Sequence, residues 1–168
     1  YRPNRDFISR TIKENHLEDK FFLNYYEEQF DLRNYFIVPA GVEFDETKLP
    51  LKHSSKKVTY FGQRTLLSTI VPIDIYNQCA YSIVAETYHN GRQSFFTEKV
   101  AKPIIAKKLF VAFSGVNYLE RLRSLGFKTF SDVIDESYDT IADSELRYQT
   151  AFEQVQYLCH ADQTEILK

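Results

Sequence analysis

The sequence predicts a three-layer α/β domain with a mostly parallel sheet. Residues 81–87 and 109–113 are nearly continuous runs of apolar and β-preferring residues, as strands that are covered on both faces require. A segment with helical features, residues 97–107, separates these two runs. Strands that alternate with helices are typical of βαβ units. We therefore expect the two strands to be adjacent, parallel and central in the sheet.

The N-terminal half is predicted from apolar spacing and from boundary signals. A helix is expected over residues 3–15, because Phe7, Ile8 and Ile12 recur at helical spacing and Asn4 is a plausible cap. The other expected elements are short strands at 21–23, 35–38 and 58–60, a polar surface loop at 42–57, a helix at 72–78 that begins on Pro72, and a turn at Asn90 and Gly91.

The C-terminal half is predicted to contain two further helices. Residues 116–125 place Leu119, Leu122 and Leu125 on one face, and Gly126 follows as a C-cap. Residues 127–134 are expected to be short and extended. The last helix covers 143–159, with Asp143 as its cap and with apolar positions at Leu146, Ala151, Phe152, Val155 and Leu158. The predicted core residues are Ile83, Val84, Ile104, Ile105, Phe110, Val111, Leu119 and Leu122.

Length and composition argue against several functional classes. A chain of 168 residues fits one domain with a single core, and its net charge of -2 argues against a broad nucleic-acid footprint. No apolar stretch approaches the ~20 residues of a membrane span. Cys79 and Cys159 form no CxxC pattern, which predicts reduced thiols in a cytoplasmic protein. Neither the isolated histidines nor the acidic residues at 135–139 have a metal-binding spacing, so no metal is expected.

The most informative stretch is residues 95–106, which read Phe-Phe-Thr-Glu-Lys-Val-Ala-Lys-Pro-Ile-Ile-Ala. It places one acid, Glu98, and two bases, Lys99 and Lys102, at the start of a predicted helix. A helix start beside a lysine favours anions, whereas a neighbouring carboxylate suits sugar hydroxyls. Because α/β sheets bind ligands at the carboxyl ends of their strands, these residues and Glu86 predict a nucleotide or nucleotide-sugar site. Either the helix kinks at Pro103 or it begins close to that residue, which would leave Glu98 and Lys99 on a loop.

Two strands and one motif carry a resemblance to a known family. The strands are residues 82–87 and 110–113, and the motif is Phe-Thr-Glu-Lys at residues 96–99. The segment 76–125 that contains them resembles the donor-binding, C-terminal lobe of GT-B glycosyltransferases, most closely the fucosyltransferase-like branch. This resemblance implies a single Rossmann-like domain over residues 1–168, either complete in itself or one lobe of a larger two-lobe protein. It also implies a nucleotide diphosphate sugar as the substrate, with no further cofactor.

The resemblance also assigns roles to individual residues. Glu98 would contact ribose hydroxyls and Lys99 the diphosphate, with Thr97 in the same motif. Glu86 would make a second ribose or sugar contact, and Arg5 or Arg2 would help to neutralise the phosphates. The acceptor and the catalytic base would belong to another lobe, so no catalytic residue is assigned.

Alternatives to this assignment follow from the same residues. Glu98 and Lys99 also fit a solvated helix start with a capping carboxylate, and Glu86 fits a surface acid at a strand end. The chain as a whole resembles uncharacterised phage and marine-microbe proteins through residues 125–130 and 135–139, a match that implies no activity. The alternative function is a non-catalytic interaction or structural domain that keeps the fold without transfer activity.

Overall fold

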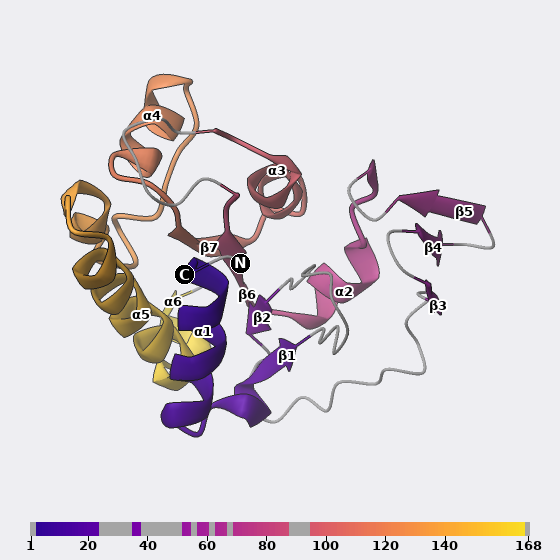
Figure 1. The fold of residues 1–168 in the computed structure, drawn as a ribbon, viewed down its shortest axis with the longest axis horizontal. Helices are drawn as coiled ribbons and strands as arrows, with labels where there is room; N and C mark the ends of the chain where they lie inside the picture. Colours follow the sequence, from indigo (N-terminus) through magenta and orange to yellow (C-terminus); the bar gives the residue numbers. More distant parts are fainter. Residues whose placement is uncertain are drawn as a thin grey trace.

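The computed structural model describes residues 3–23, 35–37, 52–54, 57–60, 63–66, 69–87 and 95–166 (Figure 1). The predicted turn at Asn90 and Gly91 and the Arg2 side chain lie outside these ranges. The elements in chain order are the helix α1 (Pro3–Glu14), the 3-10 helix η1 (Glu18–Lys20), the strands β1 (Phe21–Leu23), β2 (Tyr35–Ile37), β3 (Lys52–Ser54), β4 (Lys57–Tyr60) and β5 (Gln63–Leu66), then α2 (Ile73–Gln78), β6 (Tyr81–Ala85), α3 (Glu98–Ile105), β7 (Leu109–Phe113), α4 (Tyr118–Ser124), the 3-10 helix η4 (Ser137–Thr140), α5 (Ser144–His160) and α6 (Gln163–Ile166).

The main sheet has the strand order β1-β2-β6-β7. β6 and β7 are adjacent and parallel, as predicted, with Tyr81 opposite Leu109 and Ala85 opposite Phe113. The expectation that both strands are central is wrong for β7, which lies at the edge of the described sheet. The expectation of a mostly parallel sheet is wrong for the described strands, because β2 pairs antiparallel with both β1 and β6. Only residues 24–34 separate β1 from β2, and a parallel crossover normally needs a dozen or more residues. The described fold is therefore a mixed α/β arrangement with one parallel pair.

A second sheet consists of β3, β4 and β5 in sequential antiparallel order. β4 confirms the strand that was expected at 58–60. The expectation of a surface loop over 42–57 is wrong at its C-terminal end, since β3 and the first residue of β4 fall within that range. Polar composition did not indicate this hairpin, because a ladder of backbone hydrogen bonds can form between strands whose side chains are largely polar.

The parallel pair forms the centre of the hydrophobic core. All five residues of β6 are buried, as are residues 110–113 of β7. Figure 1 shows α1 and α5 side by side near β7. The Phe7 ring on α1 lies 6.4 Å from Phe113, 5.8 Å from Tyr148 and 6.3 Å from Phe152, measured between ring centroids. This aromatic cluster joins the N-terminal helix, the end of β7 and the long C-terminal helix.

Six of the eight predicted core residues are buried: Ile83, Val84, Phe110, Val111, Leu119 and Leu122. Ile104 is partly buried, and Ile105 is 62% exposed, so the prediction for Ile105 is wrong. The reason is the face that α3 turns toward the core. Val100 and Pro103 are buried and, being three positions apart, share one face, whereas Ile105 lies about 200° around the helix from Pro103. Lys102 is buried as well, although it lies nearer to Ile105.

The ends of the helices explain the other differences. α3 begins at Glu98 and contains Pro103, so Glu98 and Lys99 lie on the helix and not on a loop. In α4, Leu125 is exposed because the helix ends at Ser124.

Gly126 follows α4 at φ +90° as the predicted C-cap. Its N–H donates to the Arg123 carbonyl, and the Phe127 N–H donates to Leu122. This is the hydrogen-bond pattern of a Schellman motif.

The region after α4 departs from the prediction in two ways. The expected extended segment at 127–134 is interrupted by a turn over residues 130–134, because the N–H groups of Val133 and Ile134 both donate to the Phe130 carbonyl. In α5 the cap is as predicted, since the Asp143 carboxylate accepts from the Leu146 N–H at 2.8 Å. The Leu146 side chain is exposed and Arg147 is buried in its place, because the buried face of α5 passes through positions 147, 148, 151 and 155.

Candidate functional site

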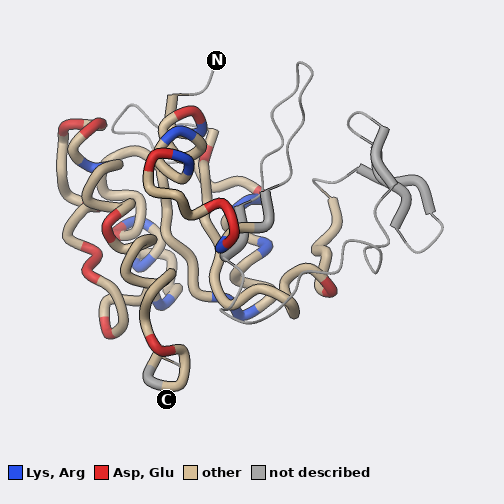
Figure 2. Tube along the Cα trace, turned by 90° about the horizontal axis from the view of Figure 1, so that it is seen from below, with Lys and Arg blue, Asp and Glu red and all other residues tan. Residues whose placement is uncertain are grey.

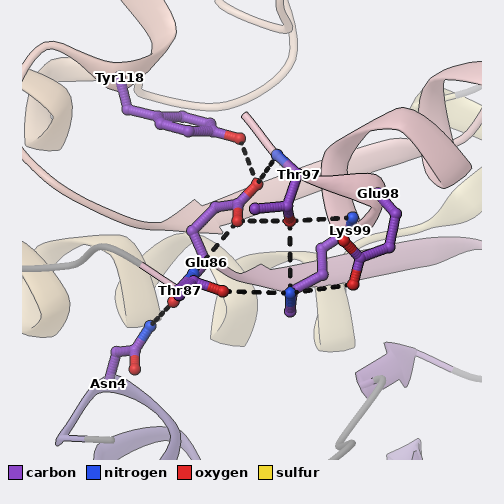
Figure 3. A network of polar contacts seen from close by, with 7 residues as sticks. All are labelled: Asn4, Glu86, Thr87, Thr97, Glu98, Lys99 and Tyr118. Atoms are coloured by element: carbon purple, nitrogen blue, oxygen red, sulfur yellow. Dashed lines mark hydrogen bonds and ion pairs between the residues drawn. The ribbon is translucent and has the colours of Figure 1, made fainter. Parts of the chain in front are cut away.

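The predicted site residues Glu86, Thr97, Glu98 and Lys99 lie together at the carboxyl end of β6 (Figure 3). Glu86 directly follows β6, and Thr97 is the N-cap of α3, with its Oγ1 accepting from the Lys99 N–H at 3.2 Å. The helix start is therefore capped by a threonine hydroxyl and not by the Glu98 carboxylate. This leaves the Glu98 carboxylate for other contacts.

Glu86 is the buried centre of this arrangement. Its side chain is 0% exposed, which excludes the interpretation as a surface acid. Oε1 accepts from the Thr97 N–H at 3.1 Å and from the Tyr118 hydroxyl at 2.9 Å. Oε2 accepts from the Thr97 hydroxyl at 2.7 Å and from the Thr87 N–H at 3.2 Å. A carboxylate accepts on both oxygens and donates on neither, so it satisfies all four of these donors.

Lys99 points back toward the same group of residues. Its Nζ lies 3.3 Å from Thr87 Oγ1, 3.3 Å from Thr97 Oγ1 and 3.1 Å from Glu98 Oε1 (Figure 3). The Lys99 side chain is 15% exposed and that of Glu98 is 35% exposed. Partial burial alone would raise the pKa of Glu98, but Lys99 and, to a smaller degree, Lys102 hold that pKa below its usual range. Glu98 is thus the more exposed member of the pair and is charged at neutral pH.

The first turn of α1 reaches the same edge of the sheet. Asn4 is fully buried, and its Nδ2 donates to the carbonyl oxygens of Glu86 at 2.9 Å and Phe113 at 3.1 Å. The prediction that Asn4 caps α1 is wrong, because the helix already begins at Pro3 and the Asn4 side chain is used across the sheet edge. Arg5, the other predicted site residue, belongs to this turn; it is buried, and its N–H donates to Asn4 Oδ1.

Two further residues complete this region: Tyr118, which the sequence did not single out, and Lys102, the second base of the 95–106 stretch. Tyr118 occupies an ordinary apolar position of α4, and no sequence signal distinguishes it. Burial and the neighbouring Glu86 carboxylate raise the pKa of its hydroxyl, which therefore stays protonated and donates. Lys102 lies four residues after Glu98, a spacing that places both on one face of α3. Burial lowers the pKa of Lys102 to about 8, which Glu98 partly offsets.

The acidic residues at 135–139 stabilise the fold. Asp139 accepts from the backbone N–H groups of Leu119 and Glu120, both at 2.9 Å, and so caps the start of α4. Tyr138 is buried, and its hydroxyl accepts from the Ala112 N–H of β7 at 3.3 Å.

Glu136 fixes the loop after α4. Its carboxylate accepts from Arg123, from the Thr129 hydroxyl and from the Phe130 N–H. In the described part of the chain, no group of three or more His, Cys, Asp or Glu residues is placed to hold a metal ion.

Comparison of the chain with models of known protein families, with curated proteins and with solved structures finds no match. The geometry around β6 and α3 is therefore the basis for a functional assignment. Figure 2 shows acidic and basic residues interspersed along the described chain. None of the described helices is long and apolar enough to cross a membrane. Cys79 and Cys159 are both free thiols, as predicted.

Proposed function

We propose that the carboxyl edge of β6 and β7 binds the nucleotide diphosphate of a sugar donor, and that the chain is a Rossmann-like donor lobe of a glycosyltransferase. The observation that carries this proposal is the position of Glu98 and Lys99 in the first turn of α3, directly beyond the end of a parallel strand. Ligands of α/β domains bind at this edge, and helix N-termini there favour phosphate groups.

Glu98 is the group suited to ribose. Its carboxylate is partly exposed and charged, so it can accept hydrogen bonds from two neighbouring hydroxyls. Glu86 is not suited to that role, because its oxygens are buried and already accept four hydrogen bonds. We therefore restrict the predicted ribose contact to Glu98.

Lys99 is the group suited to the diphosphate. Its ammonium lies beside the N-terminus of α3, whose dipole adds to the positive potential there. In the structure this ammonium pairs with Glu98 at 3.1 Å, so a diphosphate would compete with Glu98 for it. A bound nucleotide resolves this competition, because its ribose hydroxyls donate hydrogen bonds to Glu98 while its phosphates accept hydrogen bonds from Lys99. Arg5 adds a buried positive charge in the first turn of α1. The acceptor and the catalytic base stay assigned to another lobe.

Titration calorimetry with nucleoside diphosphates and with pyrophosphate tests this proposal. Lys99→Ala is expected to weaken binding of both by about 1.5–3 kcal/mol, the usual range for a hydrogen bond to a charged group. Glu98→Gln is expected to weaken nucleoside diphosphate binding more than pyrophosphate binding, because only the nucleotide has ribose hydroxyls. Lys128→Ala and Glu153→Gln change exposed residues of the same types and serve as controls. Absence of binding to the folded wild-type chain at millimolar nucleotide would refute the proposal.

A non-catalytic interaction or structural domain is the second candidate, and one observation favours it. The contacts among Glu86, Thr97, Lys99 and Glu98 form a connected network without any ligand. On that interpretation, Lys99→Ala would lower the free energy of unfolding, and the wild-type chain would show no nucleotide affinity. Unfolding and calorimetry measured on the same variants separate the two candidates.

A further inference from the structure

We propose that Glu86 is the positioning residue of this site: it holds the two threonines that in turn hold the Lys99 ammonium against Glu98. The part of this inference that concerns ligand affinity rests on the proposed function. The part that concerns the position of Lys99 does not, and it can be measured without any ligand.

The direction of the hydrogen bonds supports this role. The Thr97 hydroxyl has one proton, which it donates to Glu86 Oε2 at 2.7 Å. Its lone pairs therefore face the other way, toward the Lys99 N–H at 3.2 Å and the Lys99 Nζ at 3.3 Å. A hydroxyl that donates to a carboxylate is also a better acceptor, because hydrogen bonds in a chain polarise one another. Glu86 thus sets the orientation in which Thr97 binds Lys99.

The second threonine is held by the same carboxylate, but through its backbone. Thr87 donates its backbone N–H to Glu86 Oε2 at 3.2 Å, and its Oγ1 lies 3.3 Å from the Lys99 Nζ. Both hydroxyl oxygens that contact the ammonium therefore belong to residues bound by one carboxylate. The third contact is Glu98 Oε1, on the opposite and more exposed side. Glu86 and the two threonines thus hold the Lys99 ammonium on its buried side. The contact with Glu98, on the exposed side, is the one that a ligand can replace.

Glu86 also connects the two threonines to three helices. Asn4 of α1 donates to its backbone carbonyl, Thr97 caps α3, and Tyr118 of α4 donates to its carboxylate. The buried carboxylate therefore fixes α3 relative to its neighbours. A glutamine amide of the same shape cannot do this, because its NH₂ group is a donor and every partner of the Glu86 carboxylate also donates. In one orientation the NH₂ group would face the Thr87 N–H and the Thr97 hydroxyl. In the other it would face the Thr97 N–H and the Tyr118 hydroxyl.

The test compares Glu86→Gln and Thr97→Val with Thr97→Ser. The pKa of Glu98 is measured by carbon-detected NMR on the folded, ligand-free chain. Thr97→Val removes the hydroxyl at nearly constant shape, so it should release Lys99 and let the pKa of Glu98 rise toward its usual value. Thr97→Ser keeps the hydroxyl and should retain the wild-type pKa. Glu86→Gln should behave like Thr97→Val, and Thr97→Val remains the decisive variant if Glu86→Gln does not fold. Thr150→Val, a matched change on α5, is the control.

Pyrophosphate affinity of the same variants provides the second measurement. We expect Thr97→Val to lose about tenfold in affinity, as one displaced charged hydrogen bond implies, and Thr97→Ser to stay close to wild type. An unchanged Glu98 pKa in folded Glu86→Gln overturns the positioning role, and so does an unchanged Glu98 pKa in Thr97→Val, whatever the affinity. A Glu98 pKa that rises in a chain that binds neither pyrophosphate nor nucleoside diphosphates supports the positioning role and refutes the proposed function instead.

Discussion

Lys102 carries its charge in a side chain that is only 5% exposed, which makes its effect on stability dependent on pH. Its pKa is lowered to about 8 in the folded chain from the ordinary 10.5, mainly by burial. Between these two values the unfolded chain binds the additional proton, so stability rises with pH across that window. Below pH 8 the cost of burying the ammonium is present in full.

Lys102→Met removes this charge and keeps an unbranched side chain of similar length. At pH 7 the variant should be more stable than wild type by about 1–3 kcal/mol, since one pKa unit corresponds to about 1.4 kcal/mol. The difference should shrink as pH rises from 8 to 10.5. Urea unfolding of both chains across this range measures it, and a difference that is constant with pH would contradict the assignment. Lys107→Met, at an exposed position just after α3, is the control.

Single residues of the site were predictable to different degrees. Glu98 and Lys99 could be found because an acid and a base at a helix start form a local pattern, whereas Thr97 was named only through the resemblance of its motif. Glu86 was placed correctly at the strand end, but its burial depends on Tyr118 and on α1, which no local pattern reveals. Asn4 was interpreted as a cap for the same reason. Its carbonyl partners are 82 and 109 residues away in the sequence.

Among the elements, α4 depends on a residue that lies well after it in the chain. Asn117, its N-cap residue, makes no side-chain capping bond, and Asp139 supplies the acceptors from the segment around η4. Asp139→Ala should therefore lower the free energy of unfolding by about 1–2 kcal/mol, the usual cost of losing a helix cap.

The matched control for this prediction is Asp132→Ala, which changes an exposed aspartate in the preceding loop and should have little effect. Asp139→Asn keeps one accepting oxygen and should lose less than Asp139→Ala. Thermal unfolding ranks the three variants. Equal losses for Asp139→Ala and Asp132→Ala would show that α4 does not need this cap.

The strands of the parallel pair were predictable because burial on both faces leaves a continuous apolar run in the sequence. β1 and β2 have three residues each, which is too short for a pattern that indicates orientation, so the antiparallel half of the sheet was missed. The buried face of α3 was predicted wrongly because its buried residues include Lys102 and Pro103, two residue types that rarely indicate a core position.

For the whole molecule, the decisive contacts join the N-terminal helix to the parallel strands. Ile8 and Ile12 of α1 are fully buried in the main core, and Asn4 bridges the ends of β6 and β7. The carboxyl edge that forms the candidate site is thus completed by the beginning of the chain. Such long-range contacts are expected to make α1, β6 and β7 unfold as one cooperative unit.

Asn4→Ala tests this cooperativity. It removes two hydrogen bonds to buried strand-end carbonyls, so the free energy of unfolding should fall by about 2–3 kcal/mol. Asn15→Ala is the control, because the Asn15 side chain bonds the Thr11 carbonyl and Gln156 at an exposed position, and the change should cost less than about 1 kcal/mol. Amide hydrogen exchange gives the decisive measurement. If the helix and the strands form one unit, Asn4→Ala lowers the protection of amides in α1, β6 and β7 by the same free energy. Loss of protection confined to α1 would instead mean that the helix opens locally and that the strand edge keeps its structure without it.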